Sequence, residues 1–329
     1  MFFNKSKIIH GLDIGNYSIK LVTVCSNKEK IELKKAVFIK NEASIFEKGI
    51  LEKKKEVMEK MNNLFSNNID RGGLSCSVGS TYIVIRNINI PYMENEAILE
   101  TLKWEFSDHL PFSSNQAVID YIIRSKTTDE MKITAVFAPL EIINSYFETL
   151  KSYNLKTLNI QPVALLNILK FKNIKNTNLI IDIGFYSTNI IVGNSKNIFF
   201  TRNLKIGADK LIRFNDFNSE MEQELSLAEL NQEVKRAIRF YNKNNSTDIL
   251  DNIYLTGGGA YINKIKENLN FNKSQDIKIL NPFSEIDFKD EVIENCYNSS
   301  NLLTEYSIAF GLCLSEVYDD ENKFNNRKK

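Results

Sequence analysis

The chain contains one short pattern twice. In each copy an apolar run leads into Asp-Ile-Gly-x-Tyr-Ser, and a second apolar run follows. The first copy occupies residues 11–24 and the second residues 180–192. An apolar strand, a tight polar turn and a returning apolar strand predict a β-hairpin whose tip carries an aspartate, a glycine and a hydroxyl. The repetition predicts a duplicated α/β fold in which two hairpin tips grip one ligand.

The chemistry of the tips indicates which ligand they would hold. Glycine permits close backbone approach and a positive φ, and successive turn N–H groups can surround an anion. The aspartates, Asp13 and Asp182, supply hard oxygen atoms for Mg²⁺ or its water ligands. A polyphosphate with Mg²⁺ is therefore the predicted ligand. For either copy alone, an ordinary Asp-x-Gly turn without a binding role remains the alternative.

Length and charge limit the function classes. With 329 residues, the chain is expected to form about two domains of ordinary size. It has 42 basic and 41 acidic residues, so no net field attracts nucleic acid or an acidic membrane. No signal peptide is recognisable, and no apolar segment reaches the ~18–20 residues of a membrane helix. The expectation is a soluble, cytoplasmic protein without direct membrane insertion.

Cysteine and histidine usage excludes several kinds of site. Cys25, Cys76 and Cys313 lie in apolar surroundings and are predicted to be buried free thiols, as in a reducing compartment. The chain has only two histidines, His10 and His109. A His-rich metal site is thereby excluded, and a Ser-His-Asp triad is disfavoured.

Hydrophobic periodicity divides the chain into two similar halves with an insertion. The first half is expected to contain strands near residues 8–14, 19–26, 30–39 and 74–78, with a helix near 51–65. The second is expected to contain strands near 179–184, 188–192, 197–202 and 253–256, and helices near 226–241, 260–269 and 305–318. Between them, strands near 82–90, 117–124 and 132–137 and helices near 95–106 and 139–153 predict a small inserted α+β unit.

Two further segments leave questions open. Trp104, the single tryptophan, lies off the Leu99/Leu102/Phe106 stripe of its helix. It either packs sideways against a neighbouring subdomain, which we favour, or is exposed for a partner. The tail over residues 319–329 is charged and is expected to be disordered.

Three more features could complete a nucleotide site. Gly257, Gly258 and Gly259 follow a buried strand and precede a helix, whose N-terminus favours negative charge. Glu233 and Arg236 share one helix turn and could hold ribose and adenine; a surface ion pair is the alternative. Gly207 marks another close backbone approach or a plain helix start. Neither a Rossmann fingerprint nor a P-loop is present.

These motifs resemble the phosphate-1, phosphate-2 and adenosine motifs of the actin/Hsp70/sugar-kinase superfamily. The resemblance is closer to the PilM family, the actin-like (FtsA-type) assembly proteins of type IV pili and type II-like secretion systems. The matching stretches run in order along the chain: Gly11–Val22, Ile90-Pro91, Leu102–Phe112, Ile160–Leu165, Leu179–Ile191, Ile206-Gly207, Glu233–Tyr241, Thr256–Ala260 and Tyr306–Leu312.

The resemblance implies an actin-like ATPase fold with two duplicated βββαβα-type halves around a nucleotide cleft. Residues 1–81 and 154–175 would form the first half (1A), and residues 82–153 an inserted FtsA-like subdomain 1C. Residues 176–318 would form the second half (2A), with 2B near residues 207–250. The implied cofactors are ATP and Mg²⁺.

The resemblance also assigns roles to residues. By position, Asp13 and Asp182 would face Mg²⁺, directly or through water, and Gly15 and Gly184 would shape the tips. The phosphates would be surrounded by Asn16, Tyr17, Ser18, Lys20, Ser187 and Thr188. The nucleoside would be held by Gly207, Glu233, Arg236, Gly257, Gly258 and Gly259. Asn16-Tyr17 and Phe185-Tyr186 are bulkier than the family's small-residue tips, so their rings either pack into the core or crowd the terminal phosphate.

The implied function is that of an ATP-binding adaptor with weak or no hydrolysis. Its partner would be the cytoplasmic N-terminal peptide of a PilN-like membrane protein, which would place the adaptor at the inner face of the membrane. Self-association is compatible with the family. Two alternatives stay open at this point. One is a small-molecule kinase of the same superfamily, and the other is an FtsA-like polymerising protein, although the tail lacks FtsA's amphipathic apolar face.

Overall fold

The computed structural model describes residues 6–27, 30–65, 72–211, 217–244, 250–262, 265–266, 269, 276–294 and 303–326. The helix expected over residues 260–269 falls partly outside these ranges. Within them, no helix combines the length and the apolar character needed to span a bilayer.

Two large sheets repeat the same strand order, as the duplicated hairpins predict. The first sheet has the order β10-β6-β1-β2-β3-β16 and the second the order β13-β12-β11-β14-β15. In each, three consecutive antiparallel strands are extended on one side by two parallel ones, and the first sheet also has β16, parallel to β3, on its other side. The first sheet contains β1 (Lys7–Ile14), β2 (Ser18–Ser26), β3 (Ile31–Lys40), β6 (Gly73–Val78), β10 (Leu155–Ile160) and β16 (Ile293–Glu294). The second contains β11 (Asn178–Ile183), β12 (Thr188–Gly193), β13 (Ile198–Leu204), β14 (Asn252–Thr256) and β15 (Ile277–Ile279).

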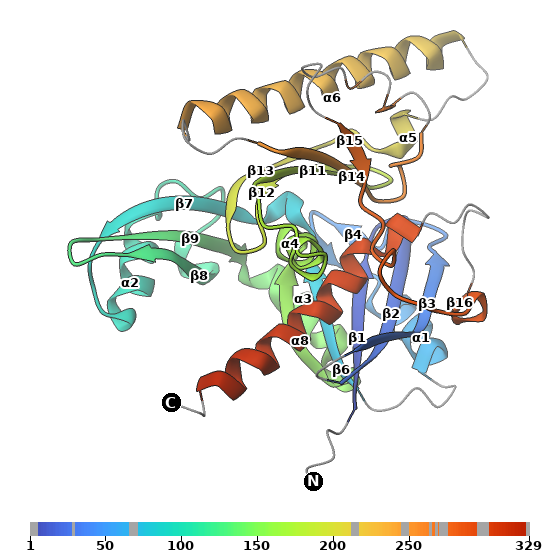
Figure 1. Cartoon of the computed structure of the whole chain (residues 1–329), viewed down its shortest axis with the longest axis horizontal. Helices are drawn as coiled ribbons and strands as arrows, with labels where there is room; N and C mark the ends of the chain where they lie inside the picture. The colour runs from blue at the N-terminus through green and yellow to red at the C-terminus, as the bar shows by residue number, and fades with distance from the viewer. Residues whose placement is uncertain are drawn as a thin grey trace.

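Helices cover both faces of both sheets, so the two halves form five layers (Figure 1). The outer layer of the first sheet holds α1 (Lys54–Phe65) and α3 (Leu140–Leu150). The middle layer, between the sheets, holds α4 (Gln161–Phe171) and α8 (Ser307–Asn326). The outer layer of the second sheet holds α6 (Phe217–Asn244), with the short α5 (Ala208–Leu211) beside it. Because each sheet is covered on both faces, its central strands, β1 and β2 in the first sheet and β11 and β12 in the second, are buried almost throughout.

The inserted unit is a three-stranded antiparallel sheet covered on one face by a helix. Its strands are β7 (Val84–Pro91), β9 (Glu130–Pro139) and β8 (Ala117–Lys126), in that spatial order, and the helix is α2 (Asn95–Glu105). Ile98, Leu102 and Phe106 form a separate small core with the sheet. The unit projects from the side of the two halves (Figure 1).

The helix that follows this sheet belongs elsewhere. Residues 139–153 were expected to close the inserted unit, but α3 packs in the core of the first sheet. Its apolar stripe, Ile142, Tyr146 and Leu150, recurs every four residues and faces α1 and the first sheet rather than α2. The small hairpin β4 (Phe46–Glu47) and β5 (Ile50–Leu51) lies beside it. Since Leu51 is in a strand, α1 begins at Lys54 and not near residue 51.

The last helix also differs from its expected place. Residues 176–318 were expected to form the second half, yet α8 packs on β1 and α4 of the first half. Two glycines allow this approach. A Cβ at Gly11 would lie 1.8 Å from the Ala309 carbonyl oxygen, and a Cβ at Gly311 would lie 2.0 Å from that of Ala164. The helix continues to Asn326, so the tail expected to be disordered is helical through that residue. Its sequence lacks the glycine or proline that would end a helix.

Strand alternation decides where the two repeated aspartates point. In β11, Ile181 and Ile183 face α6, whereas Ile180 faces the middle layer. Asp182 therefore shares the middle-layer face with Ile180. In β1, Asp13 similarly shares a face with Ile9, which packs in the middle layer. The two aspartates thus end equivalent strands on the inner faces of the two sheets, as the repeat predicts.

Candidate functional site

The two hairpin tips open onto one shared cavity of about 380 Å³. Asp13 and Asp182 both line it, one from each sheet, and both are buried. The other predicted residues that line it are Gly15, Asn16, Tyr17, Ser18, Lys20, Gly184, Ser187, Gly257 and Gly258. The structure therefore brings the two tips and the glycine segment together around one space.

The first tip is a tight turn with an internal ion pair. The Gly15 N–H donates to the Ser18 carbonyl oxygen at 3.0 Å and closes the turn. Lys20 lies opposite Asp13 in the hairpin register, and its Nζ donates to Asp13 Oδ2 at 3.0 Å. This contact places a cation at the mouth of the cavity, next to the carboxylate.

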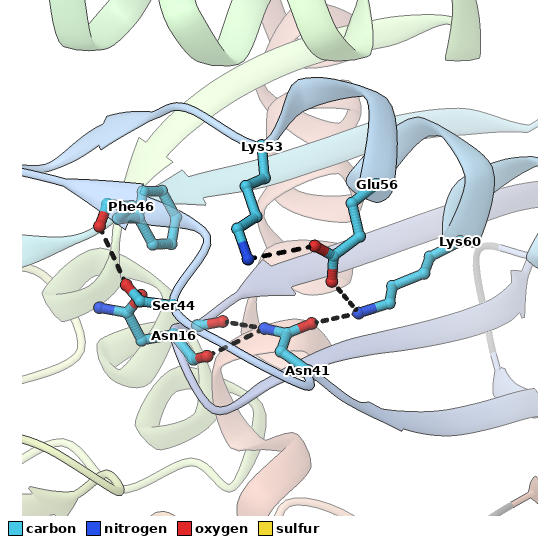
Figure 2. Close-up of polar contacts among 8 residues, drawn as sticks. Asn16, Asn41, Ser44, Phe46, Lys53, Glu56 and Lys60 are labelled. Carbon is cyan, nitrogen blue, oxygen red and sulfur yellow. Dashed lines mark hydrogen bonds and ion pairs between the residues drawn. The ribbon is translucent and has the colours of Figure 1, made fainter.

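A polar network from the neighbouring loop and α1 fixes the carbonyls of this tip (Figure 2). Asn41 Nδ2 donates to the carbonyl oxygens of Gly15 at 2.9 Å and Asn16 at 3.1 Å. Lys60 in turn donates to Asn41 Oδ1 and to Glu56, both at 2.8 Å. In a trans peptide the next N–H points opposite to the carbonyl. The N–H groups of residues 16 and 17 therefore point away from Asn41.

The second tip repeats the turn but not the ion pair. The Gly184 N–H donates to the Ser187 carbonyl oxygen at 2.9 Å. The position opposite Asp182 is Asn189, whose Nδ2 donates to Asp182 Oδ2 at 3.1 Å. Burial raises the pKa of Asp182 to about 6, against the lowering effect of the Asn189 hydrogen bond; the nearby Asp13 charge raises it further. The Lys20 charge, which lowers the pKa of Asp182, is the weakest of these influences. A buried carboxylate can act as a metal ligand.

The aromatic residues of the two tips stack on each other. Tyr17 and Phe185 lie with ring centroids 3.8 Å apart and planes at 8°, and both line the cavity. Tyr17 also packs against Phe38 at the edge of the middle-layer core. The expectation was that these rings either enter the core or crowd a terminal phosphate. Tyr17 packs against the core, as the first alternative expects, and the two rings also bridge the tips, while Tyr186 remains half exposed.

The glycine segment after β14 provides a bare stretch of backbone. Gly257 has φ +82°, and a Cβ there would lie 2.5 Å from the Ile183 carbonyl oxygen. Gly258 lines the cavity, and a Cβ added there would have no atom within 4 Å, so its backbone faces open space. Gly259 packs against Ile183 and does not line the cavity.

The remaining predicted residues lie outside the cavity lining. The Thr188 hydroxyl is buried and donates to the Ile206 carbonyl oxygen at 2.7 Å. Gly207 packs against the Phe185 carbonyl. Glu233 forms ion pairs with Arg202 and Arg236 against the outer face of the second sheet. Thr188 and Gly207 therefore support the second tip, and Glu233 with Arg236 matches the ion-pair alternative.

Some lining residues were missed from sequence. Asn189 could have been found, because Lys20 follows Asp13 by the same seven positions that separate Asn189 from Asp182. Gln161 begins α4, lines the cavity and accepts from Asn189 Nδ2 at 3.1 Å. Tyr261 lines it from the turn after β14, and Thr304 and Glu305 line it from the 3₁₀ helix Leu303–Tyr306 that leads into α8. No local pattern signals those positions.

The arrangement suits a magnesium–polyphosphate ligand. Among the described residues, no group of three or more His, Cys, Asp or Glu side chains could hold a metal by itself. Mg²⁺ is commonly bound by one or two carboxylates together with substrate phosphates. Asp13 and Asp182 line the cavity and could provide these carboxylates, and the glycine-containing turns could provide N–H groups. When bound, Mg²⁺ would neutralise phosphate charge between the tips.

Comparison with known proteins identifies the family. The family described as "Type IV pilus assembly protein PilM" matches residues 11–317. The chain belongs to this PilM family. No curated protein matched the chain.

Solved structures agree on the fold. The chain is similar to a structure of a "PilM-PilN type IV pilus biogenesis complex", with 20% identity and a TM-score of 0.74 over 94% of this chain and 98% of that one. It is also similar to the ethanolamine utilization protein EutJ from Carboxydothermus hydrogenoformans, with 15% identity and a TM-score of 0.51 over 94% and 89%. MreB 5 of Spiroplasma citri, bound to AMPPNP, has 10% identity and a TM-score of 0.50 over 98% and 99%. The fold is the actin-like ATPase fold.

Proposed function

We propose that this PilM-family protein is an ATP-binding adaptor of a type IV pilus or type II-like secretion assembly. The observation that carries the proposal is the shared cavity, in which Asp13 and Asp182 face each other from equivalent hairpins. The electrostatic effect of Asp13 on the pKa of Asp182 supports their proximity. Mg·ATP would lie with its phosphates between the tips and its nucleoside toward Gly257 and Gly258.

The chain's own residues have distinct tasks in this proposal. Asp13 and Asp182 would orient the metal, directly or through its water ligands. Lys20 would exchange part of its interaction with Asp13 for a phosphate oxygen. The first tip is already held by Asn41, so its N–H groups need little reorganisation on binding. With no general base assigned, hydrolysis would be slow, and electrostatic stabilisation would carry it.

The proposed partner is the cytoplasmic N-terminal peptide of a PilN-like membrane protein. The PilM family assignment and the similarity to a PilM–PilN complex support this partner. The adaptor would then reside in the cytoplasm, at the inner face of the membrane, through that partner. Nucleotide would set the angle between the halves and thereby favour or disfavour peptide binding.

The direct test is calorimetric titration with Mg·ATP. Wild type is expected to bind, and Asp13→Asn and Asp182→Asn are each expected to weaken binding at least about tenfold, the loss typical of a charge-assisted contact. Asp251→Asn is the matched control, because Asp251 is exposed and precedes β14 at the end opposite the cavity. Absence of binding in wild type, or equal weakening by all three variants, would refute the proposal. Pull-down of a PilN-like tail peptide with and without Mg·ATP tests the adaptor role.

A further inference from the structure

A row of three polar side chains crosses the second sheet on its inner face. Asp182, Asn189 and Asn203 are register partners on β11, β12 and β13. Asn203 Nδ2 donates to Asn189 Oδ1 at 2.8 Å, and Asn189 Nδ2 donates to Asp182 Oδ2 at 3.1 Å. We call these three residues the polar row. Asparagine is disfavoured in a buried strand unless its amide is hydrogen-bonded, so the row has a structural requirement of its own.

The carboxylate fixes the direction of every hydrogen bond in the polar row. An ionised Asp182 can only accept, so Asn189 presents its N–H₂ to Asp182, and also to Gln161 Oε1 at 3.1 Å, and its oxygen to Asn203. Asn203 then presents its N–H₂ to Asn189, which leaves its oxygen to accept from the Thr81 hydroxyl at 3.3 Å. Hydrogen bonds aligned in one direction polarise one another. A change at Asp182 therefore alters the whole row and not a single contact.

The far end of the polar row meets the turn that leads into the inserted unit. Thr81 lies in this 3₁₀ turn, Ser80–Tyr82, which precedes β7, and it also lines the cavity. The strand that carries Asn203 contacts β7 itself as well, because Asn87 Nδ2 donates to the Phe199 carbonyl oxygen at 2.8 Å. Asn87 is itself held by the Thr134 hydroxyl at 2.6 Å. One strand of the second half, β13, thus touches both β7 of the inserted unit and the turn before it (Figure 1).

We propose that the polar row couples the occupancy of Asp182 to the position of the inserted unit, with Asn189 and Asn203 as positioning residues. When Asp182 binds a cation–nucleotide ligand, its oxygen becomes less available to Asn189. The amides then shift or rotate, and the contact of Asn203 with Thr81 changes with them. The inference rests on the proposed function only for the identity of the ligand; the coupling itself resides in the free chain.

The free protein allows a test that needs no nucleotide. Hydrogen–deuterium exchange of β7 amides, relative to those of β8 in the same sheet, is measured in wild type, Asp182→Asn, Asn203→Ala and the double variant. Asp182→Asn is expected to change the β7 exchange ratio by about threefold or more, the size of typical coupling effects. In the Asn203→Ala background the same substitution is expected to have little effect. Equal effects in both backgrounds, or no effect in either, would overturn the inference.

The controls separate coupling from loss of structure. Asn203 does not line the cavity, so Asn203→Ala is expected to bind Mg·ATP within about threefold of wild type. Asn197→Ala is the matched control for Asn203→Ala, because it removes an asparagine side chain from the turn that leads into β13. In this background Asp182→Asn is expected to change β7 exchange as it does in wild type. Asn87→Ala removes the second contact and is expected to reduce the coupling further when combined with Asn203→Ala.

Adding Mg²⁺ and a non-hydrolysable ATP analogue distinguishes the two proposals. If the analogue changes β7 exchange in wild type but much less in Asn203→Ala, both proposals are supported. If hydrogen–deuterium exchange of the four nucleotide-free proteins shows coupling while calorimetry finds no binding of the analogue, the proposed function is refuted and the coupling stands. If the analogue binds while β7 exchange stays unchanged, the coupling is refuted and nucleotide binding stands.

Discussion

Replacing Asp182 with asparagine is expected to change stability in a pH-dependent way. Burial raises the pKa of Asp182 from its ordinary 3.8 to about 6, so the folded protein disfavours the charged carboxylate that is present at neutral pH. A folded pKa above the unfolded value means that this group opposes folding more strongly as pH rises through the interval from 3.8 to 6. Asparagine has nearly the same shape and carries no charge.

The magnitude follows from the two pKa values. Linkage gives a penalty of about 3 kcal/mol for wild type at pH 7 and about 1 kcal/mol at pH 4.5. Asp182→Asn should therefore gain about 2 kcal/mol more stability at pH 7 than at pH 4.5. Any pH-independent cost of the new amide cancels in this difference.

Urea unfolding of both proteins at the two pH values, without nucleotide or metal, measures the effect. Asp251→Asn is the control, since it changes an exposed carboxylate immediately before β14 of the same sheet. The reasoning would be refuted if the gain in free energy of unfolding from Asp182→Asn were equal at both pH values, or larger at pH 4.5. Either result would mean that Asp182 is not a buried, charge-disfavouring group.

Four other substitutions probe the packing around the site and the surface of the inserted unit. Phe185→Ala removes the ring stacked on Tyr17 and should lower the free energy of unfolding by about 1 kcal/mol, while Mg·ATP affinity in calorimetry rises because the space between the tips opens; a fall in affinity would show that the ring supports the ligand. Gly311→Ala should cost about 1–3 kcal/mol in urea unfolding, because a Cβ would lie 2.0 Å from the Ala164 oxygen. Gly258→Ala should change stability by less than about 0.5 kcal/mol but weaken Mg·ATP binding, since its Cβ would enter the cavity; equal destabilisation by the two glycine variants would contradict this. Trp104→Ala should leave stability within about 0.5 kcal/mol of wild type, because 82% of the residue is exposed.

The fold was predictable because its signals are local and repeated. The apolar runs that flank each Asp-Ile-Gly turn define both hairpins, and the repetition implies two equivalent sheets. Hairpin register alone then places Asp13 opposite Lys20 and Asp182 opposite Asn189. Strand alternation then puts Asp13 and Asp182 on the inner faces of the two sheets, where the two tips can share one site.

What the sequence concealed depends on tertiary packing. The favoured sideways packing of Trp104 was wrong, because α2 buries Ile98 and Leu102 and turns Trp104 outward. The place of α8 in the middle layer depends on Gly11 lying under Ala309, a contact between residues almost 300 positions apart. The stack of Tyr17 on Phe185 likewise joins two halves whose relative position no local pattern specifies. Glu233 and Arg236 had a nucleoside-like spacing, but α6 faces the other side of the sheet.

The most direct test of the account is a crystal structure of the protein grown with Mg²⁺ and a non-hydrolysable ATP analogue. The account predicts the analogue's phosphates between the two tips, with the metal facing Asp13 and Asp182 and the nucleoside beside Gly257 and Gly258. A nucleotide bound elsewhere, or a cavity that stays free of nucleotide at saturating analogue, would contradict it.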